Sequence, residues 1–347
     1  MPARSRLVGF ALTGVFVALI VWRLDVAALG QALQRANYLV VAPAALLTLT
    51  GYLLRALRWR QLLRPQGTLP FRWVFPVLMI GFMANNLLPA RMGEFVRAYV
   101  LGQKTGLSKS LGLATVLLER VFDGLTLTFF LLLLSLGFSL PGWGWEVVVV
   151  ASVVFLGALT GAVLLLTAES AFLRLLRLLV GWLPAGVEAW AVGRTQSFTL
   201  GLRVLRDPWR LLGIVGLSLG VWTLEGLSYL WILVGFQPGL PPGALPLAAF
   251  FVLVMVNLGI MLPSAPGYIG TFQFFAVLAL GVFGVGRELA LGVALVAHAM
   301  QYLLVTGLGL LFLWREQIAW SGLARSRAAF GPAVVGPASR SGTAGRE

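Results

Sequence analysis

Eight ionisable side chains interrupt or border the apolar stretches of this sequence: Arg91, Glu94, Arg97, Glu119, Arg120, Asp123, Glu225 and His298. A charged group in an apolar medium is costly, so it usually faces a partner or a polar cavity and marks a substrate or ion pathway. Glu119 and Asp123 are four residues apart, which places both on one face of a helix. The six residues from Arg91 to Asp123 carry three positive and three negative charges, so they predict a paired cluster.

These residue types favour the binding of a charged substrate. Arg91, Arg97 and Arg120 are predicted to hold a phosphate group, and the acidic residues to pair with them or with a cationic head group. The chain has no cysteine and a single histidine, which excludes thiolate nucleophiles and metal sites built on Cys or on a His cluster. No catalytic motif is recognisable, so no catalytic residue, metal site or cofactor is predicted.

Two other roles remain open for the same residues. A membrane-embedded transferase acting on a lipid-linked substrate would use the carboxylates of Glu119 and Asp123, or a metal site, near one membrane interface. A non-transporting accessory protein would use the cluster only to hold helices together. His298 by itself can serve simply as a hydrogen-bond partner for a neighbouring helix.

Two breaks with the shared pattern LPxxxG, at 88–93 and 262–267, divide apolar segments. The residues assigned to these breaks are Asn85, Asn86, Pro89 and Gly93 in the first, and Asn257, Pro263, Pro266 and Gly267 in the second. The asparagines are predicted to satisfy backbone groups that the breaks free from helical hydrogen bonding. The glycines are predicted to serve the backbone turns themselves.

The composition determines the class of protein that must position these residues. Of 347 residues, 59% are hydrophobic and 11% are charged, with a mean hydropathy of +0.92. Soluble domains carry about a quarter charged residues, so this chain is predicted to be an all-α integral membrane protein. Its net charge of +14 is interpreted as the Lys and Arg retained by cytoplasmic loops, and nucleic-acid binding is not predicted.

The apolar pattern predicts a polytopic helical bundle. Uninterrupted spans are expected at 7–22, 39–57, 111–140, 147–167, 211–236 and 289–314, and broken segments at 73–101 and 245–285. The first resembles a signal peptide without a convincing cleavage site, so it is interpreted as an uncleaved span. Residues 170–208 alternate arginine with Leu, Phe and Trp, which predicts a cytoplasmic amphipathic region. Residues 1–320 are predicted to form one membrane domain, and residues 321–347 a disordered tail.

The arginine distribution favours broken segments that return to the side from which they entered. If residues 73–88 crossed alone, Arg91, Arg97, Lys104 and Lys109 would face outside, against the positive-inside rule. Two re-entrant hairpins remove the conflict, and two tilted crossings would give the same parity. The chain is then a multi-pass protein of the cell membrane with both termini cytoplasmic.

The two halves of the chain resemble each other. Repeat one, about 39–140, and repeat two, about 210–315, each read as span, broken hairpin and span. A second register aligns 106–111 with 284–289 and places Arg120 opposite His298. Since the hairpins would enter from opposite faces, an inverted-topology repeat is predicted, as in many secondary transporters.

Three motifs resemble those of a known family: residues 85–94 (NNLLPARMGE), 117–124 (LLERVFDG) and 263–270 (PSAPGYIG). Together they are similar to the flippase-like membrane domain of lysylphosphatidylglycerol synthetases, over roughly residues 5–316. That resemblance implies movement of a lipid between leaflets. A soluble synthetase domain is not expected in the short segment after the last span, so the resemblance implies translocation rather than synthesis. It does not identify the cargo.

The expected partner is therefore a phospholipid or a lipid-linked substrate in a membrane, and a homo-oligomer is compatible with the sequence. Glu94, Arg120 and Asp123 are predicted to lie close together near the first break, with Arg91 or Arg97 lining an open polar cavity. Arg120 lies eleven residues beyond Lys109, which corresponds to about 16 Å of helix and places it near the bilayer midplane.

Overall fold

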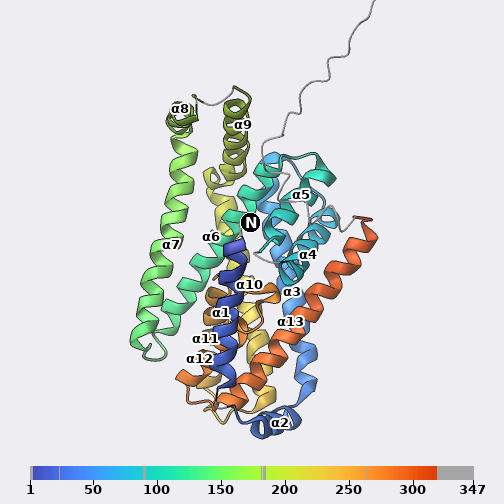
Figure 1. Cartoon of the computed structure of the whole chain (residues 1–347), viewed down its shortest axis with the longest axis vertical. Coiled ribbons are helices and arrows are strands. Elements are labelled where there is room, and N and C mark those ends of the chain that lie inside the picture. Colours follow the sequence, from blue (N-terminus) through green and yellow to red (C-terminus); the bar gives the residue numbers. More distant parts are fainter. Residues whose placement is uncertain are drawn as a thin grey trace, which may run out of the picture.

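The computed structural model describes residues 3–22, 24–88, 91–180, 182, 185–262 and 264–318, and these residues form helices without any strand (Figure 1). The α-helices are α1 (Ala3–Val21), α2 (Val26–Arg35), α3 (Val41–Leu63), α4 (Phe71–Leu87), α5 (Gly93–Thr105), α6 (Lys109–Leu134), α7 (Gly142–Thr167), α8 (Glu169–Val180), α9 (Ala185–Leu202), α10 (Pro208–Phe236), α11 (Ala244–Gly259), α12 (Thr271–Val282) and α13 (Arg287–Arg315). Short 3-10 helices are η1 (Tyr38–Val40), η2 (Arg64–Gln66), η3 (Arg203–Arg206) and η4 (Pro266–Tyr268). Pro89, Pro263 and the tail 321–347 lie outside the described residues.

Four of the described segments are long and apolar enough to cross a membrane: Tyr38–Gln66, Gly142–Thr167, Pro208–Phe236 and Arg287–Arg315. The chain is therefore an all-α polytopic membrane protein. The first predicted span forms α1, and the chain then bends by 87° into α2. The span predicted at 39–57 is longer than expected, because α3 continues to Leu63.

Local sequence accounts for several helix ends. Asp207 caps α10 by accepting a hydrogen bond from the backbone N–H of Arg210 at 3.1 Å, and Pro208 occupies the first helical position, where it removes no needed donor. Helix α5 ends at Gly106, whose φ of +72° is the left-handed conformation that favours glycine.

The amphipathic pattern predicted over 170–208 is confined to α8. Its Leu175, Leu178 and Leu179 are exposed, and Arg174 and Arg177 lie on the same helix. Helix α9 does not separate apolar and polar residues onto opposite faces. It packs against α6 and buries Thr199 and Leu202. One face of α9 is therefore covered by α6, and only α8 has the exposed apolar residues expected of an amphipathic surface helix.

Several helix contacts of the first half of the chain recur between the corresponding helices of the second half. Helices α4 and α5 fold back on each other as one hairpin, and α11 and α12 form a second. Helix α4 packs on α13, and correspondingly α11 packs on α6; α5 packs on α6, and α12 on α13. Helices α3 and α10, the first span of each half, pack against each other in the middle of the bundle (Figure 1). Each of these hairpin and span contacts therefore has its counterpart in the other half.

The first hairpin closes through a backbone contact between glycines. A Cβ added to Gly93 would lie 1.9 Å from the carbonyl oxygen of Gly81 and 2.6 Å from Oδ1 of Asn85. That Oδ1 accepts a hydrogen bond from the backbone N–H of Gly93 at 2.8 Å. Asn85 thus satisfies a backbone donor of the first turn of α5, which the intrahelical ladder leaves unpaired.

The second hairpin uses left-handed backbone at its break. Gly267 and Gly270 have φ of +68° and +82°, and Pro266 begins η4. The N–H of Gly270 donates to Oε1 of Gln273 at 2.8 Å, which caps the start of α12. The other two asparagines bond elsewhere: Asn86 donates to Thr306 of α13 at 3.0 Å, and Asn257 donates to Leu253 O within its own helix.

Replacing Gly93 with alanine is expected to lower the stability of the folded protein by at least about 1–3 kcal/mol, because the added methyl group collides with backbone that cannot move aside. The thermal unfolding midpoint in detergent is the measurement. Gly157→Ala in α7 is the control, since its added Cβ meets nothing within 4 Å. Equal midpoints for the two variants would contradict the close approach of α4 and α5.

Candidate functional site

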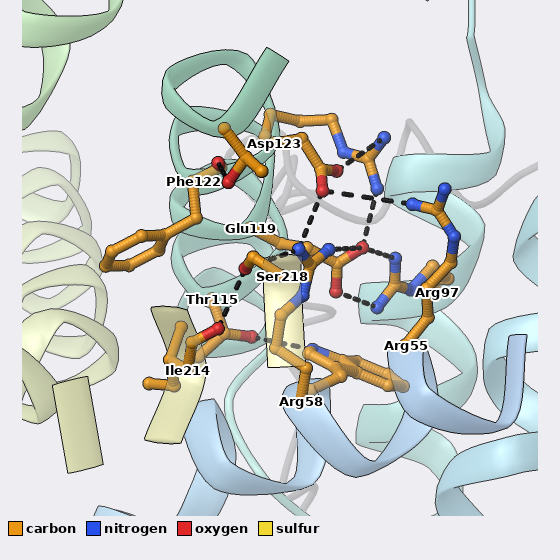
Figure 2. Close-up of polar contacts among 12 residues, drawn as sticks. Arg55, Arg58, Arg97, Thr115, Glu119, Phe122, Asp123, Ile214 and Ser218 are labelled. Atoms are coloured by element: carbon orange, nitrogen blue, oxygen red, sulfur yellow. Dashed lines mark hydrogen bonds and ion pairs between the residues drawn. The ribbon is translucent and has the colours of Figure 1, made fainter. Parts of the chain in front are cut away.

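Buried charges occupy the junction between the two apolar cores of the bundle. On α6, one core extends to Phe122 and the other resumes at Leu127, and Glu119 and Asp123 lie at the boundary. Both carboxylates are fully buried. Helices α3, α5, α6 and α10 all direct polar side chains to this point (Figure 2).

Arg58 of α3 holds the two carboxylates together. Its guanidinium lies 2.7 Å from Oδ1 of Asp123 and 3.6 Å from Oε1 of Glu119. It also donates to the hydroxyl of Ser218 on α10 at 2.9 Å, and its side chain is fully buried. This arginine therefore ties three helices together, and it does not line the cavity described below.

Arg97 of α5 forms a two-pronged pair with Glu119, with both N–O distances at 3.0 Å. Its guanidinium lies over the ring of Trp59 at 4.1 Å, which is the geometry of a cation–π contact. Arg120 contacts the same carboxylate and also approaches Oδ2 of Asp123 at 3.2 Å. Glu119 is thus shared by three arginines from three helices.

Arg55 differs from the other arginines of the cluster. Its nearest carboxylate oxygens, on Asp123 and Glu225, are 3.8 Å and 3.7 Å away, both beyond hydrogen-bond distance. Its guanidinium lies 4.5 Å from the ring of Trp222, whose indole N–H donates to Asp123 at 3.1 Å. Arg55 is therefore positioned by a ring and by two weak ion pairs, and none of its N–H groups is engaged by a close carboxylate among the described residues.

A cavity of about 100 Å³ lies beside this cluster. Its charged lining consists of Arg55, Arg91, Arg120 and Glu225. The remaining lining residues are Tyr52, Phe82, Asn85, Asn86, Trp222, Asn257, Ile260, Tyr268, Phe272, His298, Gln301, Tyr302 and Val305. Three guanidinium groups thus face one carboxylate, so the cavity is suited to an anion.

Donors in the lining are left without partners. The Nε atoms of Arg55, Arg91 and Arg120 are buried and make no hydrogen bond within the described part of the chain. A buried unpaired donor costs about 1–3 kcal/mol. The Nε atoms of Arg58 and Arg97, which do not line the cavity, are unpaired in the same way, so these donors by themselves do not distinguish the cavity.

The predicted site residues separate into two groups. Arg91, Arg120, Glu225 and His298 line the cavity, whereas Arg97, Glu119 and Asp123 are locked in the buried pairs. Glu94 pairs with Arg91 at 3.2 Å at the break, so the acidic contacts of Arg120 come from Glu119 and Asp123 instead. Arg91 or Arg97 was expected to line a cavity, and Arg91 is the one that does.

His298 of α13 has a defined environment. Its Nδ1 lies 2.9 Å from Nε2 of Gln273, and its ring stacks on Phe272 with 4.4 Å between centroids. It lines the same cavity as Arg120, its counterpart in the predicted repeat. Gln301, which lies on α13 like His298, donates a hydrogen bond from its side-chain amide to the carboxylate of Glu225 at 2.8 Å.

Sequence reasoning missed Arg55 and Arg58. They lie at the end of the span predicted over 39–57, where arginines normally face the cytoplasm, but α3 continues to Leu63 and buries both. The available signal was the apolar pair Leu62–Leu63 beyond them and their spacing of three residues, which places both on one helix face. With them, the cluster has five guanidinium groups and four carboxylates, not the three of each that were expected.

Metal binding has no support in the residues described. No group of three His, Asp or Glu side chains in that part of the chain is placed to hold a metal ion. Glu119 and Asp123 are instead neutralised by arginines.

Comparison with known proteins identifies relatives of this arrangement. The chain is 27% identical to Glycosyltransferase AglD of Haloferax volcanii over 84% of its own length, but it spans only 51% of that relative. It is 28% identical to a UPF0104 membrane protein of Methanothermobacter thermautotrophicus, covering 90% of this chain and 94% of the relative. A UPF0104 membrane protein of Methanocaldococcus jannaschii is 22% identical, over 73% of this chain and 77% of the relative.

A family model described as the lysylphosphatidylglycerol synthase TM region matches residues 6–309. The match contains both hairpins, the buried charge cluster and the cavity, which confirms the resemblance inferred from the three motifs. The chain belongs to the family of the lysylphosphatidylglycerol synthase transmembrane region.

Proposed function

We propose that this protein moves an anionic lipid, either a phospholipid or a lipid-linked phosphate compound, between the leaflets of the cell membrane. The observation that carries the proposal is the cavity with three arginines and one carboxylate in its lining. Guanidinium groups bind phosphate oxygens with paired, charge-assisted hydrogen bonds. Arg55 is the principal phosphate ligand in this proposal, because binding there breaks no close ion pair.

The size of the cavity limits what enters it. About 100 Å³ is somewhat less than the roughly 150 Å³ cavity that holds one benzene molecule, so the cavity admits a phosphate group but not a whole lipid. The lipid's chains would remain outside while its charged group crosses through the protein. This division suits a transporter that shields only the costly charge from the bilayer.

The position of the cavity supports alternating access. Asn86 and Arg91 of the first break and Asn257 and Tyr268 of the second all line it, so it lies where the two hairpins meet. In transporters built from inverted repeats, the substrate site lies at this interface near the bilayer midplane. The paired helix contacts of the two halves support such a repeat. The proposal includes re-entrant hairpins from opposite faces and cytoplasmic termini, as the arginine distribution favours.

A transferase acting on a lipid-linked substrate is the second candidate, supported by the name of the Haloferax relative. It would need a free carboxylate as a general base. Glu119 and Asp123, the two carboxylates expected to serve, are instead held by arginines at 2.7–3.2 Å, which disfavours them as general bases.

Lipid bound to gently purified protein tests the proposal directly. Mass spectrometry is expected to find a lipid that bears phosphate and carries a net negative charge, in roughly stoichiometric amount. Vesicles containing the protein and fluorescent phosphatidylglycerol are expected to move that lipid faster than protein-free vesicles. Recovery of zwitterionic or neutral lipids alone, with no acceleration for the anionic probe, would overturn the proposal.

Replacing Glu225 with glutamine is expected to tighten binding of the anionic lipid several-fold. The change removes the one negative charge that lines the cavity and competes with a phosphate for Arg55, while the amide keeps its polar contact with Gln301. Bound phosphatidylglycerol is measured by native mass spectrometry across a concentration series. Glu169→Gln on α8, which lines neither the cavity nor any other described hollow, is the control, and weaker binding by Glu225→Gln would contradict the anion site.

A further inference from the structure

A second hollow, of about 520 Å³, lies between α7 and the second hairpin. One wall is formed on α7 by Val147, Val150 and Val154, and the other by Met255, Leu258 and Phe275 of α11 and α12. We name it the apolar groove. The side chains of Val150 and Val154 are 61% and 53% exposed, so the groove is open along its side.

Two aromatic contacts shape the groove. A Cβ on Gly259 would lie 2.1 Å from the ring of Phe275, so this glycine allows α12 to pack closely on α11 and sets the ring in the wall. Phe155 is seated in the same way against Gly124 of α6. The groove is therefore built by packing and is not a gap between loose helices.

The length of the groove corresponds to one leaflet. It follows α7 from Trp143 to Phe155, which is about 18 Å of helix. The hydrocarbon core of a bilayer is about 30 Å thick, so one leaflet is about 15 Å. Trp143 and Glu146 lie in the first turns of α7, at one end of the groove, where an amphipathic Trp and a charge suit the membrane interface. The groove thus extends from an interface to the depth of the break.

The groove and the polar cavity share one wall. Asn257 and Ile260 line the cavity, while Leu258 and Met261, their neighbours in sequence, line the groove. The end of α11 therefore lies between the polar cavity and the apolar groove. The two are separated by about 10 Å, the diameter of one helix. Helix α11 ends at Gly259, so both sites lie beside the end of this helix and next to the second break.

We infer that the apolar groove binds one hydrocarbon chain of the lipid whose phosphate occupies the cavity. The inference rests on the proposed function and adds a second site to it. A chain can slide in sideways from the bilayer through the open edge at Val150 and Val154, while the phosphate remains near Arg55. The substrate class is then a phosphate-bearing lipid with at least one long chain, and free phosphate is a poor substitute.

The test uses phosphatidylglycerol with a photoreactive group at the end of one acyl chain, bound to the purified full-length protein. Cross-linked peptides covering residues 255–275 are quantified by mass spectrometry. Val154→Trp and Val150→Trp, which fill the groove, are each expected to lower this cross-linking at least five-fold. Val153→Trp and Val149→Trp are the matched controls, since both residues are exposed on α7 but do not line the groove.

Arg55→Gln separates the substrate's chain from bulk lipid. If the chain in the groove belongs to the lipid anchored in the cavity, this variant is also expected to lower cross-linking at 255–275 several-fold. If Val150→Trp and Val154→Trp leave the cross-linking unchanged, the chain does not bind in the groove and the inference is overturned. If these two variants lower the cross-linking but Arg55→Gln does not, bulk lipid fills the groove, and the inference is overturned as well. If Arg55→Gln lowers bound phosphatidylglycerol but neither groove variant affects the chain, the proposed function stands without this inference. If Arg55→Gln leaves bound phosphatidylglycerol unchanged, the proposed function itself fails.

Discussion

Replacing Arg55 with glutamine is expected to slow lipid movement by about 10- to 100-fold while the protein still accumulates and folds. Hydrogen bonds to a charged group contribute about 1.5–3 kcal/mol, and each 1.4 kcal/mol is a factor of ten. The fold tolerates the change because Arg55 makes only ion pairs of 3.7–3.8 Å with its acidic neighbours. The rate of fluorescent phosphatidylglycerol movement in vesicles is the measurement.

The control for this variant is Arg64→Gln, which removes an exposed arginine just beyond the end of the same helix. It is expected to move lipid at the wild-type rate. If Arg55→Gln moved lipid at the wild-type rate, Arg55 would not be part of the substrate site. Arg55→Lys adds a further distinction, since a lysine keeps the charge but cannot supply paired donors, so an intermediate rate is expected.

Replacing Arg58 with methionine is expected to have the opposite profile, with loss of folded protein before any specific loss of transport. Arg58 is fully buried and lies 2.7 Å from Asp123. Removing one partner of a buried ion pair destabilises by about 3–5 kcal/mol, because the other charge is left without compensation. Folded yield and the unfolding midpoint in detergent, measured by size-exclusion chromatography after heating, are the readouts.

Arg58→Lys provides the companion to this variant. It keeps a positive charge but cannot reach Asp123, Glu119 and Ser218 together as the guanidinium does. Its unfolding midpoint is expected to lie between those of the wild type and of Arg58→Met. A folded, thermally normal Arg58→Met that no longer moves lipid would show that this residue binds substrate, and the division of the arginines into structural and substrate-facing groups would be wrong.

The contrast between Arg55 and Arg58 explains how a buried cluster can serve both stability and transport. They are three residues apart on α3, yet one is enclosed by Asp123, Glu119 and Ser218 and the other faces the cavity. The locked pairs hold α3, α5, α6 and α10 together at the level of the breaks. The same arrangement positions Arg55 and Arg120 in the lining of the cavity, where the proposed function places the phosphate.

The sequence by itself determined the class of the protein, the approximate position of most helices and the two breaks. These follow from composition and local pattern: long apolar runs must be helical in a bilayer, because only a helix satisfies every backbone group within one segment. The sequence also identified the charges on α6, Glu225 and His298 as unusual, since each interrupts such a run. The three motifs indicated the family, and the match over residues 6–309 confirms it.

Only the tertiary structure decided which charges meet. Arg55 approaches Glu225 across 170 positions of sequence, and Arg97 is enclosed by Glu119 and Trp59 and turned away from the cavity. Such pairings depend on the angles and register at which helices pack, which no local pattern specifies. The end of α3 was misplaced for the same physical reason. An arginine ends a span when it is exposed, but partners on α6 and α10 allow Arg55 and Arg58 to remain inside it.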